Sequence, residues 1–529
     1  MTTRRDLLAL AAVSPVALAG VAHAQGRPGG RPGPSSPGAG APTARDGAAP
    51  GQARESTAST PAKDANEFAP FPPDASARQS ATVGGRTVAY TATVGSLPVR
   101  NETGKRIADV VFTAFIADSG RGDLSRPVTF AFNGGPGAAS VYLNLGAIGP
   151  KRVQFGANGD SPSDPARLQD NPASWIDFTD LVFIDPVGTG FSRSLVAEDE
   201  TRRRFYAVQP DIEYLSRIVY DWLLKNGRLQ SPKYVVGESY GGFRGPRITH
   251  YLQTKLGVGV NGTVLVSPLL DGASRSAGDI SPLPWMMTLP TVAASKLERE
   301  NRLTDAAMAE VIGYTRGEYL RDIMAGRSDP GATDRVVAKV TQMTGLSPEF
   351  VRRAGGRLET QSVLREVFRT QGKLGSRYDV NVQSYDPFPY DPDQRPNDPI
   401  LDSIIAPCVS AIVDFTTRVV GWKVDARYEP LSDTVNRLWD RGRGPQTESV
   451  TDLRESLAID PKLKVLIVHG WNDLSCPFMA SVLIADQTPV MGSADRLQVR
   501  MYPGGHMFYS RADSGAAFRR DVQALYTRR

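Results

Sequence analysis

The alternation of apolar and polar positions predicts strands and helices that follow one another along most of the chain. Asp211–Leu224 repeats apolar residues at helical spacing, which predicts an amphipathic helix. Short apolar runs, typical of parallel strands buried on both faces, occur at Val128–Phe132, Leu181–Asp185, Tyr234–Val236, Val264–Val266 and Val465–Val468. Strand–helix–strand alternation predicts an α/β fold in which helices flank a mostly parallel central sheet.

The first part of the folded region has a different pattern. Thr82–Val94 and Ile107–Ile116 are rich in β-branched and aromatic residues, with partial two-residue alternation. Such runs favour antiparallel strands. We therefore expect the sheet to begin with antiparallel strands before its parallel part.

A long interval interrupts the strand–helix rhythm. Residues 273–459 contain mostly helical patterns at Asp305–Met324, Thr333–Met343 and Gln361–Thr370, and a loop-rich stretch at Tyr378–Pro399. The sequence therefore predicts a core formed by residues 68–272 and 460–529. We expect residues 273–459 to form a mainly helical cap inserted into it.

The N-terminus predicts export. Residues 1–24 combine Arg4 and Arg5, an apolar stretch and an Ala22-His23-Ala24 cleavage pattern, as in a signal peptide. The paired arginines favour the twin-arginine type over an ordinary secretory signal. Half of residues 25–50 are Gly or Pro, so residues 25–67 are expected to be a disordered linker. We expect a periplasmic or secreted bacterial protein.

Composition excludes several classes of partner. The 529 residues include 61 basic and 56 acidic side chains, a balance that gives no reason to expect nucleic-acid binding. The apolar stretch of the signal is short for a bilayer span and no later run approaches that length, so no stable membrane anchor is expected. Cys408 and Cys476 are the two cysteines of the chain, and their pairing stays open. No metal or other cofactor is expected.

The segment Gly237-Glu238-Ser239-Tyr240-Gly241 follows a predicted apolar strand and precedes a predicted helix. A serine on a sharp strand-to-helix turn projects its hydroxyl from the edge of the sheet, and the flanking glycines leave room for that turn. The sequence therefore predicts Ser239 as a nucleophile.

A serine nucleophile needs a base and an acid that orients the base. His506 follows the predicted strand Leu497–Tyr502, and Asp473 follows the strand that ends at Val468. The order Ser239, Asp473, His506 is that of the α/β-hydrolase fold. His250 and His469 are interpreted as structural histidines.

The negative oxygen of an acyl-transfer intermediate needs backbone N–H donors. The residue after the nucleophile, Tyr240, supplies one of them. The glycine-rich loop Asn133–Gly137 follows another strand and lets bare backbone approach the reacting carbonyl. It lacks the Gly-Lys-Ser/Thr ending of a phosphate-binding loop.

Together these motifs resemble the serine carboxypeptidases. The resemblance covers most of the chain from Thr82 onward, in the same order. It rests on Asn133-Gly-Gly-Pro-Gly137, Asn171-Pro-Ala-Ser-Trp175, Phe183-Ile-Asp185, Gly188-Thr-Gly-Phe-Ser192, Gly237-Glu-Ser-Tyr-Gly241, Gly470-Trp-Asn-Asp473 and Gly505-His506. The residues around Leu474–Phe478 and His506-Met507 resemble a bacterial branch of the family.

The resemblance implies a carboxypeptidase that hydrolyses the C-terminal peptide bond of peptides through an acyl-enzyme. Ser239 would be the nucleophile, His506 the base and Asp473 the orienting acid. The N–H groups of Gly135 and Tyr240 would form the oxyanion hole. Asn133, Gly134 and Glu238 would recognise the substrate carboxylate. Glu238 can donate a hydrogen bond to a carboxylate only when protonated, so activity is expected to favour mildly acidic pH.

One position departs from the family pattern. Better-known members carry a second glutamate beyond the glycine-rich loop, where this chain has Ala147. Either Glu238 and Asn133 suffice, or another group from the cap replaces it, or the enzyme is not a strict exopeptidase. An esterase or acyltransferase with the same triad is the corresponding alternative. An inactive binding protein is the remaining alternative. Cys476 matches a position where the family often has a free thiol. The oligomeric state is left open.

Overall fold

The computed structural model describes residues 69–527, apart from 121, 154–161, 164–165, 273, 275–279 and 392–396. The predicted signal peptide, residues 1–24, and the predicted linker, residues 25–67, lie outside the described residues. All that follows concerns the described part of the chain.

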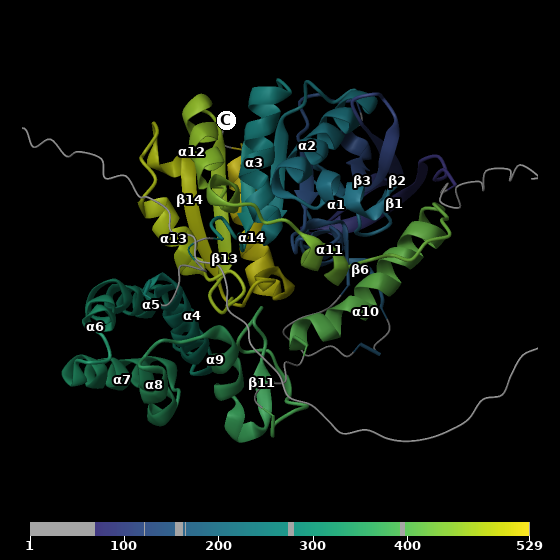
Figure 1. Ribbon diagram of the computed structural model, residues 1–529. Coiled ribbons are helices and arrows are strands. Elements are labelled where there is room, and N and C mark those ends of the chain that lie inside the picture. Colours follow the sequence, from purple (N-terminus) through teal and green to yellow (C-terminus); the bar gives the residue numbers. More distant parts are fainter. Residues whose placement is uncertain are drawn as a thin grey trace, which may run out of the picture. The chain divides into compact units, whose positions relative to one another are not determined.

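A ten-stranded sheet forms the centre of this region, in the order β1-β2-β3-β7-β4-β9-β10-β13-β14 with β8 paired to β3. Its strands are β1 Ala75–Val83, β2 Arg86–Arg100, β3 Arg106–Ala117, β4 Val128–Phe132, β7 Asp180–Ile184, β8 Arg193–Ser194, β9 Lys233–Glu238, β10 Gly262–Val266, β13 Lys464–Gly470 and β14 Leu497–Tyr502. From β7 to β14 every pair is parallel, whereas β1, β2 and β3 are antiparallel (Figure 1). The predicted α/β fold is confirmed.

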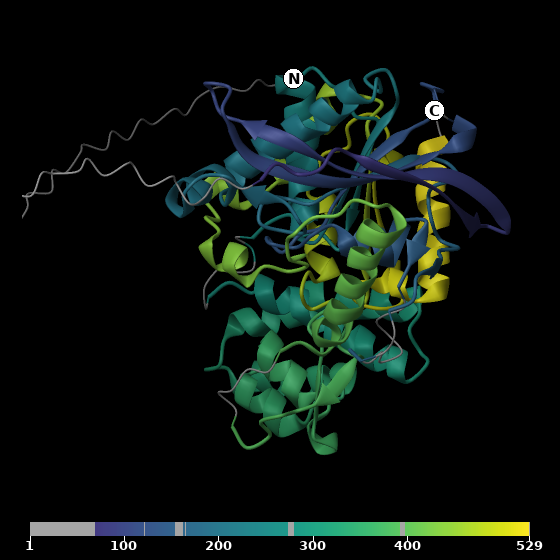
Figure 2. The same cartoon turned by 90° about the vertical axis from the view of Figure 1, so that its right-hand side faces the viewer.

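The predicted antiparallel opening of the sheet is confirmed, but the β-rich segment Thr82–Val94 contains a reversal of the chain between two strands. The chain turns there at Gly84 and Gly85, with φ values of 55° and 78°, and joins β1 to β2 as a hairpin. Two consecutive residues with positive φ match the turn whose twist suits a two-residue hairpin. The β-branched pattern continues through both strands, so the pattern alone does not reveal the reversal. Figure 2 shows these long strands across the sheet.

Helices cover both faces of the sheet because neighbouring strand residues point to opposite sides. Val235 and Phe130 belong to one apolar cluster, with α2 and α3, and Val236 and Ala131 belong to the other, with α14. The helices are α1 Glu198–Phe205, α2 Val208–Lys225, α3 Tyr240–Lys255, α4 Leu283–Arg299, α5 Asp305–Tyr314, α6 Leu320–Ala325, α7 Pro330–Thr344, α8 Pro348–Ala354, α9 Thr360–Glu366, α10 Pro399–Asp414, α11 Asp433–Leu438, α12 Val450–Ile459, α13 Phe478–Asp486 and α14 Ala512–Thr527.

Shorter elements complete the chain. Two small ladders pair β5 Lys151–Arg152 with β6 Gln169–Asp170, and β11 Lys373–Gly375 with β12 Gln383–Tyr385. Single turns of 3₁₀ or π helix are η1 Asp118–Gly120, η2 Leu143–Ile148, η4 Thr315–Tyr319, η5 Arg369–Gln371, η6 Phe415–Val419, η7 Gly444–Thr447, η8 Ala494–Arg496 and η9 Phe508–Ser510.

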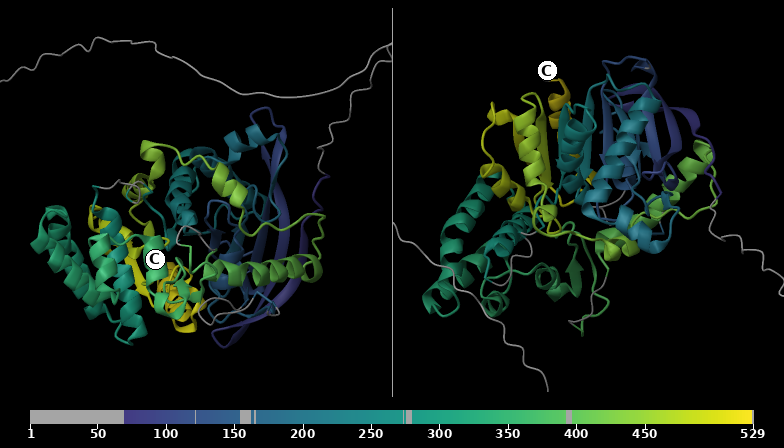
Figure 3. Two further views of the ribbon diagram at one scale, coloured as in Figure 1. Left: turned by 60° about the horizontal axis from the view of Figure 1, so that its bottom comes forward. Right: turned by 45° about the horizontal axis from the view of Figure 1, so that its top comes forward.

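The interval predicted as a cap packs in two ways. Helices α4, α6, α7, α8 and α9 enclose a separate apolar cluster around Val340 and Val351, and they lie together in Figure 3. Helices α11 and α12 instead contribute Val435 and Leu453 to the cluster of α2 and α3. The described residues around α4–α9 thus have a core of their own, whereas α11 and α12 pack with the sheet.

One helical stretch in this interval, Pro399–Val419, is long and apolar enough to cross a membrane by length and composition. The expectation that no apolar stretch after the signal reaches such a length is therefore wrong, because α10 continues directly into η6. Ile404 and Ala411 of α10 are buried in the cluster on the α14 side of the sheet.

Asp180, at the start of β7, forms ion pairs with arginines from two different loops. It is fully buried and pairs with Arg126 Nε at 2.8 Å and Arg228 Nη1 at 2.6 Å. Removal of one member of a buried ion pair leaves the other charges uncompensated. We expect Asp180→Ala to lower the free energy of unfolding by about 3 to 5 kcal/mol in a urea titration.

The matched control for Asp180→Ala is Arg78→Ala. This variant removes the ion pair between Arg78 and Asp118, in which the Arg78 side chain is 79% exposed. Exposed pairs contribute less than about 1 kcal/mol. Equal losses in the two variants would contradict the assignment of Asp180 as a buried anchor.

Candidate active site

Ser239 occupies the turn between β9 and α3 in a strained backbone conformation, with φ 61° and ψ −120°. A side chain at Gly237 would overlap the carbonyl oxygen of Gly241, and one at Gly241 would overlap that of Phe132. The turn is therefore possible only with glycine at both positions. The Ser239 amide donates to the Val266 carbonyl at 2.9 Å, which ties the turn to β10.

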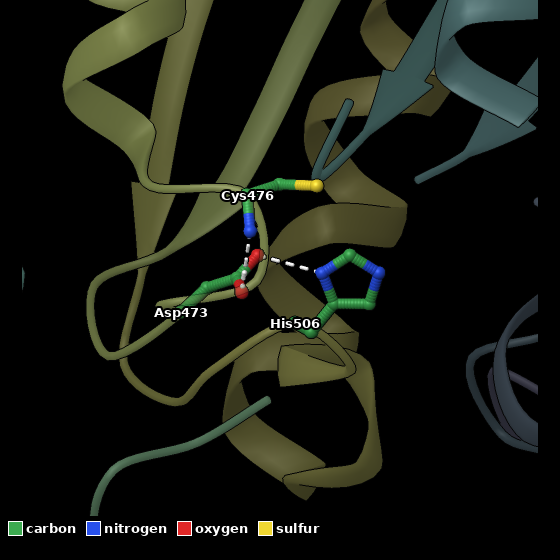
Figure 4. A group of neighbouring side chains, drawn as sticks. All are labelled: Asp473, Cys476 and His506. Atoms are coloured by element: carbon green, nitrogen blue, oxygen red, sulfur yellow. Dashed lines mark hydrogen bonds and ion pairs between the residues drawn. The ribbon is translucent and has the colours of Figure 1, made fainter. Parts of the chain in front are cut away.

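Asp473 and His506 lie at the carboxyl ends of neighbouring parallel strands, β13 and β14, and are paired. Asp473 Oδ2 lies 2.7 Å from His506 Nδ1, and both side chains are buried (Figure 4). Asp473 Oδ1 accepts hydrogen bonds from the amides of Ser475 and Cys476, at 2.7 and 3.0 Å. Burial lowers the pKa of His506, but the charge and hydrogen bond of Asp473 outweigh it and raise the pKa overall.

The predicted nucleophile and base line the same pocket. Ser239 and His506 both contribute to the wall of a cavity of about 530 Å³, together with Glu238, Tyr240 and the loop Asn133–Pro136. Within the described residues no hydrogen bond joins the Ser239 hydroxyl to the His506 ring. Such contacts are commonly long without substrate and shorten when substrate binds.

The glycine-rich loop after β4 meets the nucleophile turn. A Cβ atom at Gly134 would overlap the backbone nitrogen of Tyr240 and lie 2.7 Å from the carbonyl oxygen of Glu238. Gly135 has φ 97°, which glycine adopts without strain. The backbone around Gly135 and Tyr240 therefore borders the pocket that contains Ser239.

Glu238 precedes the nucleophile and is buried with two hydrogen-bond donors. Asn133 Nδ2 donates to Oε2 at 2.6 Å, and the Tyr509 hydroxyl donates to Oε1 at 2.8 Å. Burial is the main cause that raises the pKa of Glu238 to about 7, although both hydrogen bonds and His506 act in the opposite direction. A substantial fraction of this carboxyl group is thus protonated in mildly acidic solution.

The position of Asn133 depends on a buried ion pair that the sequence did not reveal. Arg244 Nη1 donates to the Asn133 carbonyl at 2.8 Å, and Arg244 Nε donates to Asp211 at 2.6 Å. Both charged side chains have no exposed surface. Arg244 and Asp211 are ordinary members of helices α3 and α2 in sequence, so only the packing of these helices shows the contact.

A second network links helix α4 to the loops that carry Asp473 and His506. Arg511, five residues after His506, pairs with Glu298 of α4 at 2.6 Å and with Asp379 at 2.7 Å. Glu298 also accepts a hydrogen bond of 2.7 Å from Asn472, the neighbour of Asp473. The residues on both sides of the Asp473–His506 pair are therefore attached to the helical region.

The remaining cysteines and histidines have structural environments. Cys408 and Cys476 are both buried and are not joined by a disulfide, which excludes the disulfide alternative. His469 bonds to the Ser481 hydroxyl at 2.8 Å, and burial lowers its pKa to about 3. His250 lies 3.3 Å from Glu455.

Two groupings of side chains have the spacing of metal ligands. The first, Asp473, Cys476 and His506, has its potential ligand atoms within 4.8 Å of one another. Both oxygens of Asp473 are already engaged by hydrogen bonds, which account for the closeness of this group (Figure 4). The second, His250, Asp452 and Glu455, lies partly exposed beside Arg247, which pairs with Asp452.

Comparison with known proteins finds a family similarity over part of the chain. Residues 106–309, which include Asn133 and Ser239, match the family model described as serine carboxypeptidase. This segment is similar to the serine carboxypeptidases. Asp473 and His506 lie beyond the matched segment, so their places are known here from the structure alone.

Curated serine carboxypeptidase relatives match over short segments. Serine carboxypeptidase-like 9 of Arabidopsis thaliana is 28% identical over 190 residues, which cover 33% of this chain and 41% of the relative. Pheromone-processing carboxypeptidase kex1 of Sclerotinia sclerotiorum is 35% identical over 119 residues, 22% of this chain and 17% of the relative. The chain thus spans less than half the length of these plant and fungal carboxypeptidases.

A solved carboxypeptidase has the same fold. The crystal structure of Kex1(delta)p, a prohormone-processing carboxypeptidase from Saccharomyces cerevisiae, superposes with a TM-score of 0.52 at 16% identity. The superposition covers 82% of this chain and 91% of the yeast chain. The likeness in fold therefore extends well beyond residues 106–309.

The strained turn and the pocket predict a reactive hydroxyl at Ser239. We expect a fluorophosphonate probe to label the protein at Ser239, located by peptide mass spectrometry, and Ser239→Ala to abolish labelling. Asp473→Asn should slow labelling by about ten-thousandfold, because it stabilises the wrong tautomer of His506.

Ser475→Ala is the matched control for the labelling experiment, because Ser475 lines the same pocket and contacts Asp473 through its backbone amide. Labelling of Ser239→Ala at the rate of the unmodified protein would contradict the assignment of the nucleophile.

Proposed function

We propose that this protein is a serine-type carboxypeptidase that removes the C-terminal residue of peptides. The observation that carries the proposal is the environment of Glu238: a buried carboxyl group with a pKa of about 7, directly before the nucleophile and bonded to Asn133. A general acyl hydrolase has no need for a protonated acid at this place. A protonated carboxyl group can donate a hydrogen bond to the free carboxylate of a peptide.

The chemistry follows from the groups around the pocket. Ser239 Oγ attacks the carbonyl carbon of the last peptide bond while His506 Nε2 accepts the hydroxyl proton, and Asp473 stabilises the resulting imidazolium. The N–H groups of Gly135 and Tyr240 bind the negative oxygen. The intermediate collapses, His506 returns the proton to the leaving amine, and water then hydrolyses the acyl-enzyme by the same route.

The leaving residue is held by its carboxylate. Asn133 Nδ2, the backbone N–H of Gly134 and the protonated Glu238 are the proposed donors. Below about pH 7 Glu238 is mostly protonated and donates; above it Glu238 is ionised and repels the substrate carboxylate. His506 must be neutral to act as base, so activity also falls at low pH.

An esterase or acyltransferase with the same triad is the alternative proposal, since the triad alone does not determine the leaving group. Ala147, where family members carry a second glutamate, is buried in η2 and offers its carbonyl oxygen to Asn171 Nδ2 at 2.9 Å. Recognition of the carboxylate therefore rests on fewer acids than in those members.

The proposed carboxypeptidase requires a free C-terminal carboxylate on its substrate, whereas an esterase or acyltransferase does not. We expect kcat/KM for a peptide with a free C-terminus to exceed that for the same peptide amidated by at least about a hundredfold, because amidation removes the charged acceptor. Hydrolysis followed by liquid chromatography measures both rates. Similar rates for the two peptides would favour the esterase or acyltransferase.

The pH dependence tests the role of Glu238. For the free-acid peptide we expect kcat/KM to decline above about pH 7 in the unmodified enzyme. Glu238→Gln, whose amide donates at every pH, should lose this decline and retain the one at low pH. The amidated peptide is the control, and a decline at high pH that persists in Glu238→Gln would contradict the role.

We propose further that the chain is an exported bacterial member of the family, periplasmic or secreted, on the basis of the arginine pair and apolar stretch in residues 1–24. After expression in a bacterial host, osmotic shock should release the protein. Its measured mass should correspond to a chain whose N-terminus lies near Gln25. Replacement of Arg4 and Arg5 by lysine should retain it in the cytoplasm if the twin-arginine route is used.

A further inference from the structure

Arg377 lines the catalytic pocket together with Ser239 and His506, and it comes from the helical region rather than from the sheet. Its backbone is fixed on both sides: the amide donates to Asp398 Oδ2 at 2.8 Å, and the carbonyl accepts from the Leu474 amide at 2.9 Å. The guanidinium is close enough to His506 for its positive charge to lower the pKa of that ring. Arg377 therefore lies at the pocket through its own backbone contacts.

The guanidinium of Arg377 has no anionic partner among the described residues. None of their carboxylates forms an ion pair with it, and its Nε atom is buried without a hydrogen-bond acceptor. A buried donor on a charged group costs free energy unless a partner is supplied. The Arg377 guanidinium is therefore available to an acceptor that enters the pocket.

The wall that contains Arg377 adjoins the site for the leaving residue. The next residue, Tyr378, packs its ring edge-on against His506, with ring centroids 5.2 Å apart. Burial raises the pKa of Tyr142, and the charges of Cys408, Tyr378 and Glu238 add to that shift, so Tyr142 lies near both Tyr378 and Glu238. Tyr142 and Tyr378 thus connect the Glu238 end of the pocket to Arg377.

A larger cavity of about 1250 Å³ shares Arg377, Tyr378 and Leu401 with the catalytic pocket. Four acidic side chains line this larger cavity among the described residues. Asp386 and Glu366 are paired with Arg365 and Arg369. Glu359 accepts a hydrogen bond from Trp285, and Asp398 accepts hydrogen bonds from the Ser376 hydroxyl and the Arg377 amide. Other basic side chains on its wall contact rings or backbone instead of carboxylates. These are Arg327, Arg353, Arg357 and Lys373. The potential on this side of Arg377 therefore favours a negative charge.

We propose that Arg377 binds the side-chain carboxylate of the substrate's C-terminal residue, which makes the enzyme selective for peptides that end in Glu or Asp. The inference rests on the carboxypeptidase function proposed above. Asn133, Gly134 and Glu238 hold the terminal carboxylate, so the group of the same residue that can reach the adjoining wall is its side chain. The planar guanidinium matches a carboxylate in shape and charge.

The experiment compares N-blocked dipeptides that share one acyl residue and end in Glu, Gln or Leu. It is run at about pH 6, where a glutamate side chain is ionised. The unmodified enzyme should prefer Glu over Gln by about tenfold to a hundredfold in kcat/KM, mostly through KM. Arg377→Gln should abolish the preference. Removal of this positive charge also raises the pKa of His506 and lowers the rate for every peptide, so the ratio of kcat/KM for the Glu and Gln peptides is the readout. Arg377→Lys should keep part of the preference, because it retains charge but not shape.

Arg441→Gln is the matched control, because Arg441 also lines the pocket without a carboxylate partner among the described residues and bonds to Asn436 instead. It should keep the preference for Glu over Gln, which separates a local effect from loss of net charge. Cleavage of the Leu peptide by Arg377→Gln also shows that this variant has folded.

Several outcomes would overturn the inference. Absence of a Glu preference in the unmodified enzyme, or its persistence in Arg377→Gln, would remove the role. An equal loss for all three peptides in Arg377→Gln would assign Arg377 to the terminal carboxylate instead. A preference that follows an acidic acyl residue would place the contact on the other side of the scissile bond. Failure to cleave any of the peptides, with Ser239 still labelled, would overturn the proposed carboxypeptidase function as well.

Discussion

The loop after β4 and the turn after β9 approach each other so closely that no side chain fits between Gly134 and the amide of Tyr240. This contact is possible because β4 and β9 are adjacent parallel strands whose carboxyl ends lie at the same edge of the sheet. It brings two backbone segments to one side of Ser239 without any side chain between them. The glycines are therefore requirements of packing as much as of chemistry.

Burial has opposite consequences for the two titratable groups of the pocket. It favours the neutral form of both Glu238 and His506, but His506 has the Asp473 carboxylate beside it and Glu238 has only neutral donors. The pKa of each group consequently moves upward, for different reasons. Since the base must be neutral and Glu238 protonated, both requirements are met in a limited range of pH.

The sequence was sufficient to predict the groups that follow strand ends. Ser239, Asp473 and His506 each come shortly after an apolar run, and parallel strands bring such positions together whatever their distance along the chain. The hairpin at Gly84 was missed because alternation continues through both of its strands. The contacts of Arg244, Tyr509 and Arg377 were missed for another reason. They depend on how helices and loops pack against one another, which a local sequence pattern does not predict.

Through the ion pairs of Arg511, the helical region also contacts the loops that position Asp473 and His506. Glu298 of α4 reaches both the arginine behind His506 and the residue before Asp473, so part of the support for the catalytic pair comes from outside the sheet. A chimaera in which another protein's helices replaced α4–α9 would also need an acid at the place of Glu298. A substitution of Glu298 would therefore be felt on the side of the Asp473–His506 pair that faces the helices, because Arg511 and Asn472 would both lose their acceptor.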